Sequence, residues 1–183
     1  MKRTWKIDGA HSEVHFAVRH MVVAKVRGRF NTWSGELDLD EENLSRSTVA
    51  VDIDVASIDT SNGQRDGHLR SADFFDVERF PAMGFRSKRV ERAGGDRYRV
   101  VGDLTIKGTT REVVLDAELL GFAKDPWGKD RAAFSASASI DRREFGLTWN
   151  QVLEAGGVLV GDKIEIGIEL QAVAQAAAAR SAA

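Results

Sequence analysis

Residues 132–141 read AAFSASASID, and apolar and polar side chains alternate from Phe134 to Asp141. Ala132, Phe134, Ala136, Ala138 and Ile140 fall on one face, whereas serines and an aspartate occupy the other. Because successive side chains of a β-strand point to opposite faces, a period of two is typical of a strand with one buried side. The stretch therefore predicts a β-strand whose inner face is mostly alanine.

The same alternation recurs along the rest of the chain. Residues 49–55, 98–106, 113–119 and 164–170 each place apolar side chains on one face, and shorter runs cover 35–40 and 82–90. Near the N-terminus, Val14, Phe16, Val18 and His20 share one face. Turn-forming segments at 41–46, 93–96, 107–110 and 125–130 separate the runs and are typical of hairpins. We expect eight or more antiparallel strands.

Only two segments favour a helix. One lies within QRDGHLRSADFFD, residues 64–76, where Asp66 and Arg70 have the spacing of neighbours on a helix surface. The other is short and lies around residues 150–157, where Gly156 and Gly157 would end it. We therefore predict one or two short helices beside the strands.

Many strands with one apolar face each need a shared interior. A sheet closed into a barrel provides one and removes its exposed edges, and a two-sheet sandwich is the alternative that alternation alone does not separate. Several of the residues that face inward are small, and they include Gly28, Gly102 and Ala117. Their size permits an internal cavity. We expect a single barrel domain over residues 1–174, followed by an Ala-rich, disordered tail at 175–183.

Composition excludes several classes of function. The chain has 183 residues, a formal net charge of −2 and no cysteine. Near-neutral charge gives no bulk field for nucleic acid or an anionic membrane, and the absence of cysteine removes disulfides, thiolate nucleophiles and Cys-based zinc sites. The start lacks the apolar segment of a signal peptide, and no apolar run reaches the length of a membrane span. We expect no nucleic-acid partner, no stable membrane insertion and a cytoplasmic location, with a periplasmic or secreted one open if a leader was removed.

Two polar clusters raise the possibility of a metal site. His11, Glu13 and His15 would project to one side of an extended strand, a plausible spacing for nitrogen and oxygen ligands, although the default for that face is solvent. Asp66, His68, Asp73 and Asp76 form the second cluster, but Asp66 and His68 point about 200° apart on a helix. The structural interpretation of the second cluster is that Arg65 and Asp66 tie the segment to neighbouring strands. Leu69, Phe74 and Phe75 would then be buried.

The sequence resembles the YceI family of bacterial lipocalin-like proteins. The resemblance rests on WKIDGAHSEVHFAVRHM, VRGRFNTWSGEL, SIDT, RDGHLRSADFFDVERFP, GDLTIKGTTREV, DPWG, IDRREFGLTWN and GDKIEI, and it covers roughly residues 4–173. It implies an all-β fold, an elongated eight-stranded antiparallel barrel with a hydrophobic pore partly closed by short helices. It also implies binding of polyisoprenoids or other long-chain amphiphiles, and it suggests a homodimer. Lys107 departs from the family, which often has histidine at that position.

We therefore expect a binding protein, not an enzyme, that needs no cofactor and holds an isoprenoid or similar lipid inside the barrel. The expected interior contacts are Val14, Phe16, Val18, His20, Phe30, Phe85, Leu104, Phe134, Ala136 and Ala138. Trp127, Arg142 and Trp149 lie in turn-like segments and are expected at the mouth, near a polar head group. The alternatives are a metal-dependent enzyme built on His11, Glu13 and His15, and a solidly packed barrel that acts as an interaction module.

Overall fold

The computed structural model describes residues 1–176, and antiparallel strands make up most of this region. The polypeptide forms eleven strands in one continuous sheet, with neighbouring strands antiparallel throughout. The strands are β1 (Lys2–Ile7), β2 (Glu13–His20), β3 (Ala24–Phe30), β4 (Trp33–Asp40), β5 (Thr48–Asp54), β6 (Ile58–Asp59), β7 (Ala82–Gly94), β8 (Arg97–Ile106), β9 (Thr109–Lys124), β10 (Asp130–Asp141) and β11 (Val160–Ala174).

Strand β11 closes the sheet into a barrel. One edge of β11 pairs with β10, while the other edge pairs with β2 along Val160–Glu169 and with β1 along Ala172–Ala174. Strands β1 and β2 are thus one barrel strand, interrupted by the 3-10 helix η1 (Gly9–His11). Strands β3 and β4 form a second interrupted strand, since they pair with β2 and β1 respectively.

Strands β5 and β6 form the third interrupted strand, because they pair with β4 and β3 and are separated by η3 (Val55–Ser57). If each of the three interrupted pairs is counted as one strand, the eleven strands form a barrel of eight antiparallel strands. This confirms the predicted fold. The four predicted hairpin segments connect β4 to β5, β7 to β8, β8 to β9 and β9 to β10. Two further 3-10 turns are η2 (Leu44–Arg46) and η4 (Arg142–Phe145).

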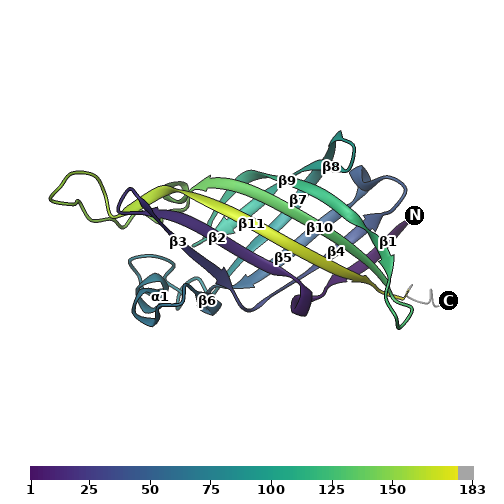
Figure 1. The fold of residues 1–183 in the computed structure, drawn as a ribbon, viewed down its shortest axis with the longest axis horizontal. Coiled ribbons are helices and arrows are strands. Elements are labelled where there is room, and N and C mark those ends of the chain that lie inside the picture. The colour runs from purple at the N-terminus through teal and green to yellow at the C-terminus, as the bar shows by residue number, and fades with distance from the viewer. Residues whose placement is uncertain (177–183) are drawn as a thin grey trace.

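The barrel is elongated, and its two ends differ (Figure 1). Helix α1 (Gly63–Arg70) and β6 lie at one end, together with the loop between η4 and β11. Both the N-terminus and the last described residues of the chain lie at the other end. We call these the helix end and the terminal end. No helix among residues 1–176 is both long and apolar enough to cross a membrane.

Helix α1 is fixed to the barrel by polar contacts, as the sequence predicted. Asn62 caps the helix by accepting from the Arg65 backbone N–H, and buried Asp66 accepts from both the backbone N–H and the hydroxyl of Thr60. The Arg65 Nε atom donates to the Thr60 hydroxyl at 2.8 Å. Arg70 donates to the carbonyls of residues 56 and 58 at 2.8 and 2.9 Å. These contacts hold α1 against η3 and β6.

The predicted helix at residues 150–157 is wrong. This segment is a loop in which Val152 and Val158 form an isolated antiparallel bridge, and Gly156 and Gly157 have φ of 86° and 89°. The Asn150 side chain accepts from the Val160 N–H and donates to the Val160 carbonyl, at 3.0 and 2.8 Å. These bonds hold the two ends of the loop together. Glycine adopts the left-handed conformation at little cost, so Gly156 and Gly157 allow the chain to turn back on itself.

The first residue of the predicted tail, Gln175, is bonded to the barrel. The Gln175 backbone N–H donates to the Thr4 carbonyl at 2.9 Å, which extends the pairing between β11 and β1 by one residue. The rest of the predicted tail, residues 177–183, lies outside the described residues.

Candidate functional site

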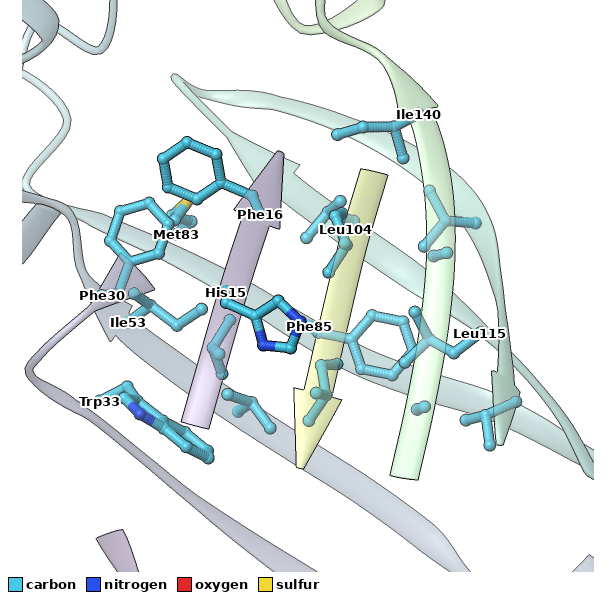
Figure 2. Close-up of a pocket in the computed structure, with 18 of the residues that line it drawn as sticks. His15, Phe16, Phe30, Trp33, Ile53, Met83, Phe85, Leu104, Leu115 and Ile140 are labelled. Atoms are coloured by element: carbon cyan, nitrogen blue, oxygen red, sulfur yellow. The ribbon is translucent and has the colours of Figure 1, made fainter. Parts of the chain in front are cut away.

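The barrel encloses a cavity of about 270 Å³ whose wall is almost entirely apolar. Figure 2 shows Phe16, Phe30 and Met83 together in one part of this wall, and Phe85 and Leu115 in another. An apolar cavity of about 150 Å³ already stays dry and takes up a benzene-sized molecule. The barrel interior therefore has room for a larger apolar group, and its wall offers that group dispersion contacts instead of hydrogen bonds.

Small side chains on β10 and β9 keep the interior open. Ala136 lies opposite Ile168 on one neighbouring strand and Ala117 on the other, so two of three adjacent wall positions carry only a methyl group. Ala138, the next inward residue of β10, continues this thin wall. Ala136 and Ala138 of the inner face of β10 thus border empty space.

The inward glycines behave differently from the alanines. A Cβ atom on Gly28 would collide with the ring of Phe16, and one on Gly102 would collide with the ring of Phe85. The space beside these glycines is therefore filled by aromatic rings, and we correct the expectation that both leave volume free. Their role is to let Phe16 and Phe85 lie close against the wall.

Burial along β11 separates the hollow region from the packed one. Ile164, Ile166 and Ile168 point inward but are only half-buried, because their side chains face the cavity. Towards the terminal end the same strand reaches Leu170, which is buried. At about 3.3 Å per residue, the half-buried positions Ile164–Ile168 extend over roughly 13 Å of strand.

A packed group of apolar side chains closes the cavity at the terminal end. Its centre is Trp5, whose exposed fraction is 0%, and Leu39 and Ala172 are exposed by only 2% and 0%. The guanidinium carbon of Arg3 lies 4.7 Å from the centre of the Trp5 ring and covers its outer side. We call this group the terminal cluster; it consists of Trp5, Leu37, Leu39, Leu44, Ala132, Leu170 and Ala172.

Residues around α1 cover the cavity at the helix end. Leu69, Phe74 and Phe75 line the cavity from this side; Phe74 is buried as predicted, whereas Leu69 and Phe75 are only half-buried. The Trp149 ring lies 5.2 Å from the Phe74 ring and 4.7 Å from the His68 ring, measured between centroids. Trp149 thereby joins the loop before β11 to the α1 segment. Lys107 also lies here and donates to the Ala72 carbonyl at 3.4 Å.

Most of the predicted contact residues lie in the cavity wall, and three do not. His20 ends β2 and pairs with Ala24 and Val160, outside the wall, and neither Trp127 nor Trp149 belongs to it. The predicted residues that do line the cavity are Val14, Phe16, Val18, Phe30, Phe85, Leu104, Phe134, Ala136, Ala138 and Arg142.

Arg142 is a buried structural residue, with an exposed fraction of 3%. Its guanidinium donates to the carbonyls of Gly161, Leu147 and Trp149, and at 3.4 Å it reaches both the Val160 carbonyl and Asp162. Burial lowers the pKa of Arg142, although an arginine remains charged at any physiological pH. The donors of Arg142 are thus used within the protein, and a head group would have to compete with these carbonyls.

Trp127 lies far from Arg142 and Trp149, so the three predicted residues do not form one mouth. Trp127 is 80% exposed in the turn between β9 and β10, where Asp125 accepts from the backbone N–H groups of Trp127 and Lys129. This turn lies at the terminal end, whereas the chain leaves β10 at the helix end (Figure 1). All three residues were predicted at the mouth because they lie in turn-like segments. A turn-like sequence does not show at which end of the barrel the turn lies.

The geometry assumed for a metal site at His11, Glu13 and His15 is wrong. His11 belongs to η1, not to the strand, and its Nδ1 lies 2.9 Å from Asp8 Oδ2. The His15 ring lies against Gly167 of the neighbouring strand. In the second cluster, Asp66 bonds to Thr60 while His68 lies 2.8 Å from Asp73. Within residues 1–176, no three histidine, aspartate or glutamate side chains are grouped as metal ligands.

Much of the cavity wall was not predicted from the sequence. Trp33, Met83 and Tyr98 line the cavity but were not named, and the signal for Tyr98 was its position on an alternating apolar face. The same signal marks further unnamed wall residues, which are Val51, Ile53, Val100, Ile106, Val113, Leu115, Ile164, Ile166, Ile168 and Leu170.

Comparison with known sequences identifies one family. The model of the YceI-like domain matches residues 5–172. A UPF0312 protein from Photorhabdus laumondii is 42% identical over 145 residues, which are 78% of this chain and 75% of that protein. A UPF0312 protein from Vibrio cholerae is 38% identical over 139 residues, covering 76% of this chain and 74% of the relative.

Solved structures show the same barrel. BcnA from Burkholderia cenocepacia matches with a TM-score of 0.80 and 25% identity, over 90% of this chain and 98% of BcnA. The YceI protein of Campylobacter jejuni matches with a TM-score of 0.75 and 32% identity, over 86% and 90% of the two chains. A polyisoprenoid-binding domain from Saccharophagus degradans shares the fold, with a TM-score of 0.68 at 15% identity, over 93% and 98% of the two chains.

Proposed function

The chain belongs to the YceI-like domain family, and from this premise we propose that it binds a polyisoprenoid or a similar long-chain lipid inside the barrel. The observation that carries the proposal is the cavity inside the barrel, which has a volume of about 270 Å³ and an apolar wall. The Saccharophagus degradans domain with the same fold binds polyisoprenoid, which supports this choice of ligand.

The chemistry of the wall favours a chain without polar groups along its length. Aliphatic and aromatic side chains from all eight barrel strands face the cavity, and Arg142, the charged guanidinium among them, is already engaged with carbonyls. A hydroxyl or phosphate deep inside would lose its water without gaining a partner, at a cost of several kcal/mol. The polar head of the ligand therefore belongs at an end of the barrel.

Transfer of the chain out of water supplies the binding energy. Each buried CH₂ contributes about 0.8 kcal/mol, so ten carbons contribute roughly 8 kcal/mol before the cost of ordering the chain. No bond of the ligand needs to be made or broken for this function. We accordingly propose carriage, storage or sequestration of the lipid, not catalysis.

Extraction of protein purified without detergent, followed by mass spectrometry, tests the proposal. We expect an isoprenoid or another long-chain lipid in close to stoichiometric amount. The delipidated protein should then retain an added radiolabelled prenyl alcohol through gel filtration. Protein that carries no lipid and retains none of the added alcohol would overturn the proposal and favour a barrel that serves another purpose.

A further inference from the structure

Two adjacent loops at the helix end expose a group of apolar side chains. The turn between β2 and β3 carries Val23, which is 84% exposed, and the loop before β11 carries Val152, which is 79% exposed. The Met21 backbone N–H donates to the Leu159 carbonyl at 2.9 Å and joins the two loops. In Figure 1 these loops project beyond the barrel on the same side as α1. We call this group the apolar tip; it consists of Met21, Val22, Val23, Val152 and Val158.

The backbone of the tip has a conformation that folding alone would not select. Met21 and Val22 have φ of 50° and 68°, in the left-handed region. A β-branched residue there is a genuine outlier, and glycine or asparagine would fit the turn at lower cost. The turn therefore displays large apolar side chains to solvent despite the strain, which points to a use for those side chains outside the folded chain.

Basic side chains lie on the outer face of the barrel behind the tip. Arg19 pairs in register with Lys25, while Arg27 lies two residues further along β3, and Lys163 lies on the adjacent strand. Glu165 lies among them, 2.7 Å from Lys25 Nζ, and Lys25 most of all, followed by Lys163 and Arg19, lowers the pKa of this carboxyl. Arg19, Lys25 and Lys163 thus lie around Glu165, with Asp162 in the same shallow hollow, and with Arg27 the cations of this basic band outnumber the two carboxylates.

The tip is directly connected to the wall of the cavity. Val160 follows the tip loop in the chain and lines the cavity, as does Leu147 at the start of the same loop. Arg142 donates to the carbonyls of both residues, so one buried side chain ties the base of the loop together. Whatever surface contacts the tip therefore lies beside the helix end of the cavity.

We propose that the apolar tip inserts into the surface of an anionic lipid bilayer and presents the helix end of the barrel to the membrane. The proposal rests on the proposed function, because a lipid cargo resides in a bilayer before it enters a protein. A projecting apolar tip backed by cations is the combination that binds anionic interfaces. A stable protein partner would need about 20–30 residues on each side, far more than the five of the tip.

Vesicle sedimentation tests the proposal on the full chain. The probes are vesicles of phosphatidylcholine alone and of phosphatidylcholine mixed with phosphatidylglycerol. We expect the native protein to sediment with the anionic vesicles, and the double variant Val22→Asn, Val152→Ser to partition about tenfold less because two inserted apolar side chains are lost. Arg19→Gln with Lys163→Gln should remove the preference for the anionic vesicles.

The control is Trp127→Ser, which removes a larger exposed apolar side chain at the terminal end. This variant should sediment as the native protein does, and no variant should have a thermal midpoint below the native one, because Val22→Asn relieves backbone strain. Native protein that stays in the supernatant, tip variants that bind normally, or an equal loss in Trp127→Ser would each overturn docking through the tip. Retention of a prenyl alcohol added without vesicles distinguishes the two proposals, because failed docking leaves it intact and a failed proposed function abolishes it.

Discussion

The terminal cluster and the middle of the barrel follow the same alternating pattern, yet one is packed and the other hollow. In the terminal cluster, Trp5 lies against Leu37 and Ala172 and is fully buried. In the middle, Ala136 lies opposite Ile168 and Ala117, and the isoleucine remains half-buried. The comparison teaches that alternation determines which side chains point inward, whereas the summed volume of those side chains determines whether the interior is filled.

Loss of Trp5 should produce the largest effect on stability. Trp5→Ala removes the side chain at the centre of the packed end and leaves a void that its neighbours fill only partly. We expect a loss of about 3–5 kcal/mol in the free energy of unfolding, measured by chemical denaturation. A loss below about 1 kcal/mol would mean that the terminal end is no better packed than the middle.

A matched pair of aliphatic truncations compares the two regions at similar size. Leu39→Ala in the terminal cluster should cost about 2–5 kcal/mol, the usual range for a packed core. Ile166→Ala should cost only about 1–2 kcal/mol, because the Ile166 side chain is only half-buried and loses fewer contacts than Leu39, which is 2% exposed. Denaturant titration of both delipidated variants measures the difference. Equal costs would contradict the hollow middle.

The contacts of α1 should contribute a smaller amount. Asp66→Ala leaves the Thr60 N–H and hydroxyl without their acceptor in a buried position, and we expect a loss of about 1–3 kcal/mol. Asp73→Ala is the control, since Asp73 is an exposed partner of His68 and should change stability by less than about 1 kcal/mol. Thermal unfolding of the two variants separates them. Indistinguishable midpoints would remove the structural role assigned to Asp66.

Acid should weaken the terminal end through its carboxylates. Arg131 lowers the pKa of Asp8, and the Lys129 backbone N–H followed by Arg131 lowers the pKa of Asp125, both from an ordinary value of 3.8. Because the unfolded chain binds these protons more readily, the stabilisation is present above about pH 4 and is lost as the pH falls through the lowered pKa values. Arg131→Met should therefore flatten the decline of the thermal midpoint below pH 4. An unchanged decline would assign the acid sensitivity to other carboxylates.

The fold was accessible from the sequence because alternation is a local signal. It located the inward faces of β2, β10 and β11, and the Asp66 segment was correctly placed against the strands. The closure of β11 onto both β1 and β2 was not accessible, since it depends on pairing between residues more than a hundred positions apart. Trp127 shows the same limit for the site, because a turn sequence does not reveal the end of the barrel on which it lies.

Local composition also predicted the wrong structure for residues 150–157. Gln151, Leu153 and Glu154 favour a helix, but Asn150 and the two left-handed glycines fold the segment into a loop. The inward glycines were likewise ambiguous, because a missing Cβ either leaves space or admits a neighbouring ring. At Gly28 and Gly102 the structure has the second arrangement, with Phe16 and Phe85 against the backbone.

Ala136→Trp tests the hollow middle most directly, in a paired measurement of stability and binding. The residue lies in the cavity wall, so the account predicts that the indole occupies space otherwise used by the lipid. The delipidated variant should keep a near-native thermal midpoint, while retention of a radiolabelled prenyl alcohol should fall sharply. Ser137→Trp, on the exposed face of the same strand, should retain the alcohol as the native protein does. A solidly packed interior would instead cost Ala136→Trp about 1–3 kcal/mol or more. That loss of stability, or full retention of the alcohol by a stable variant, would contradict the account.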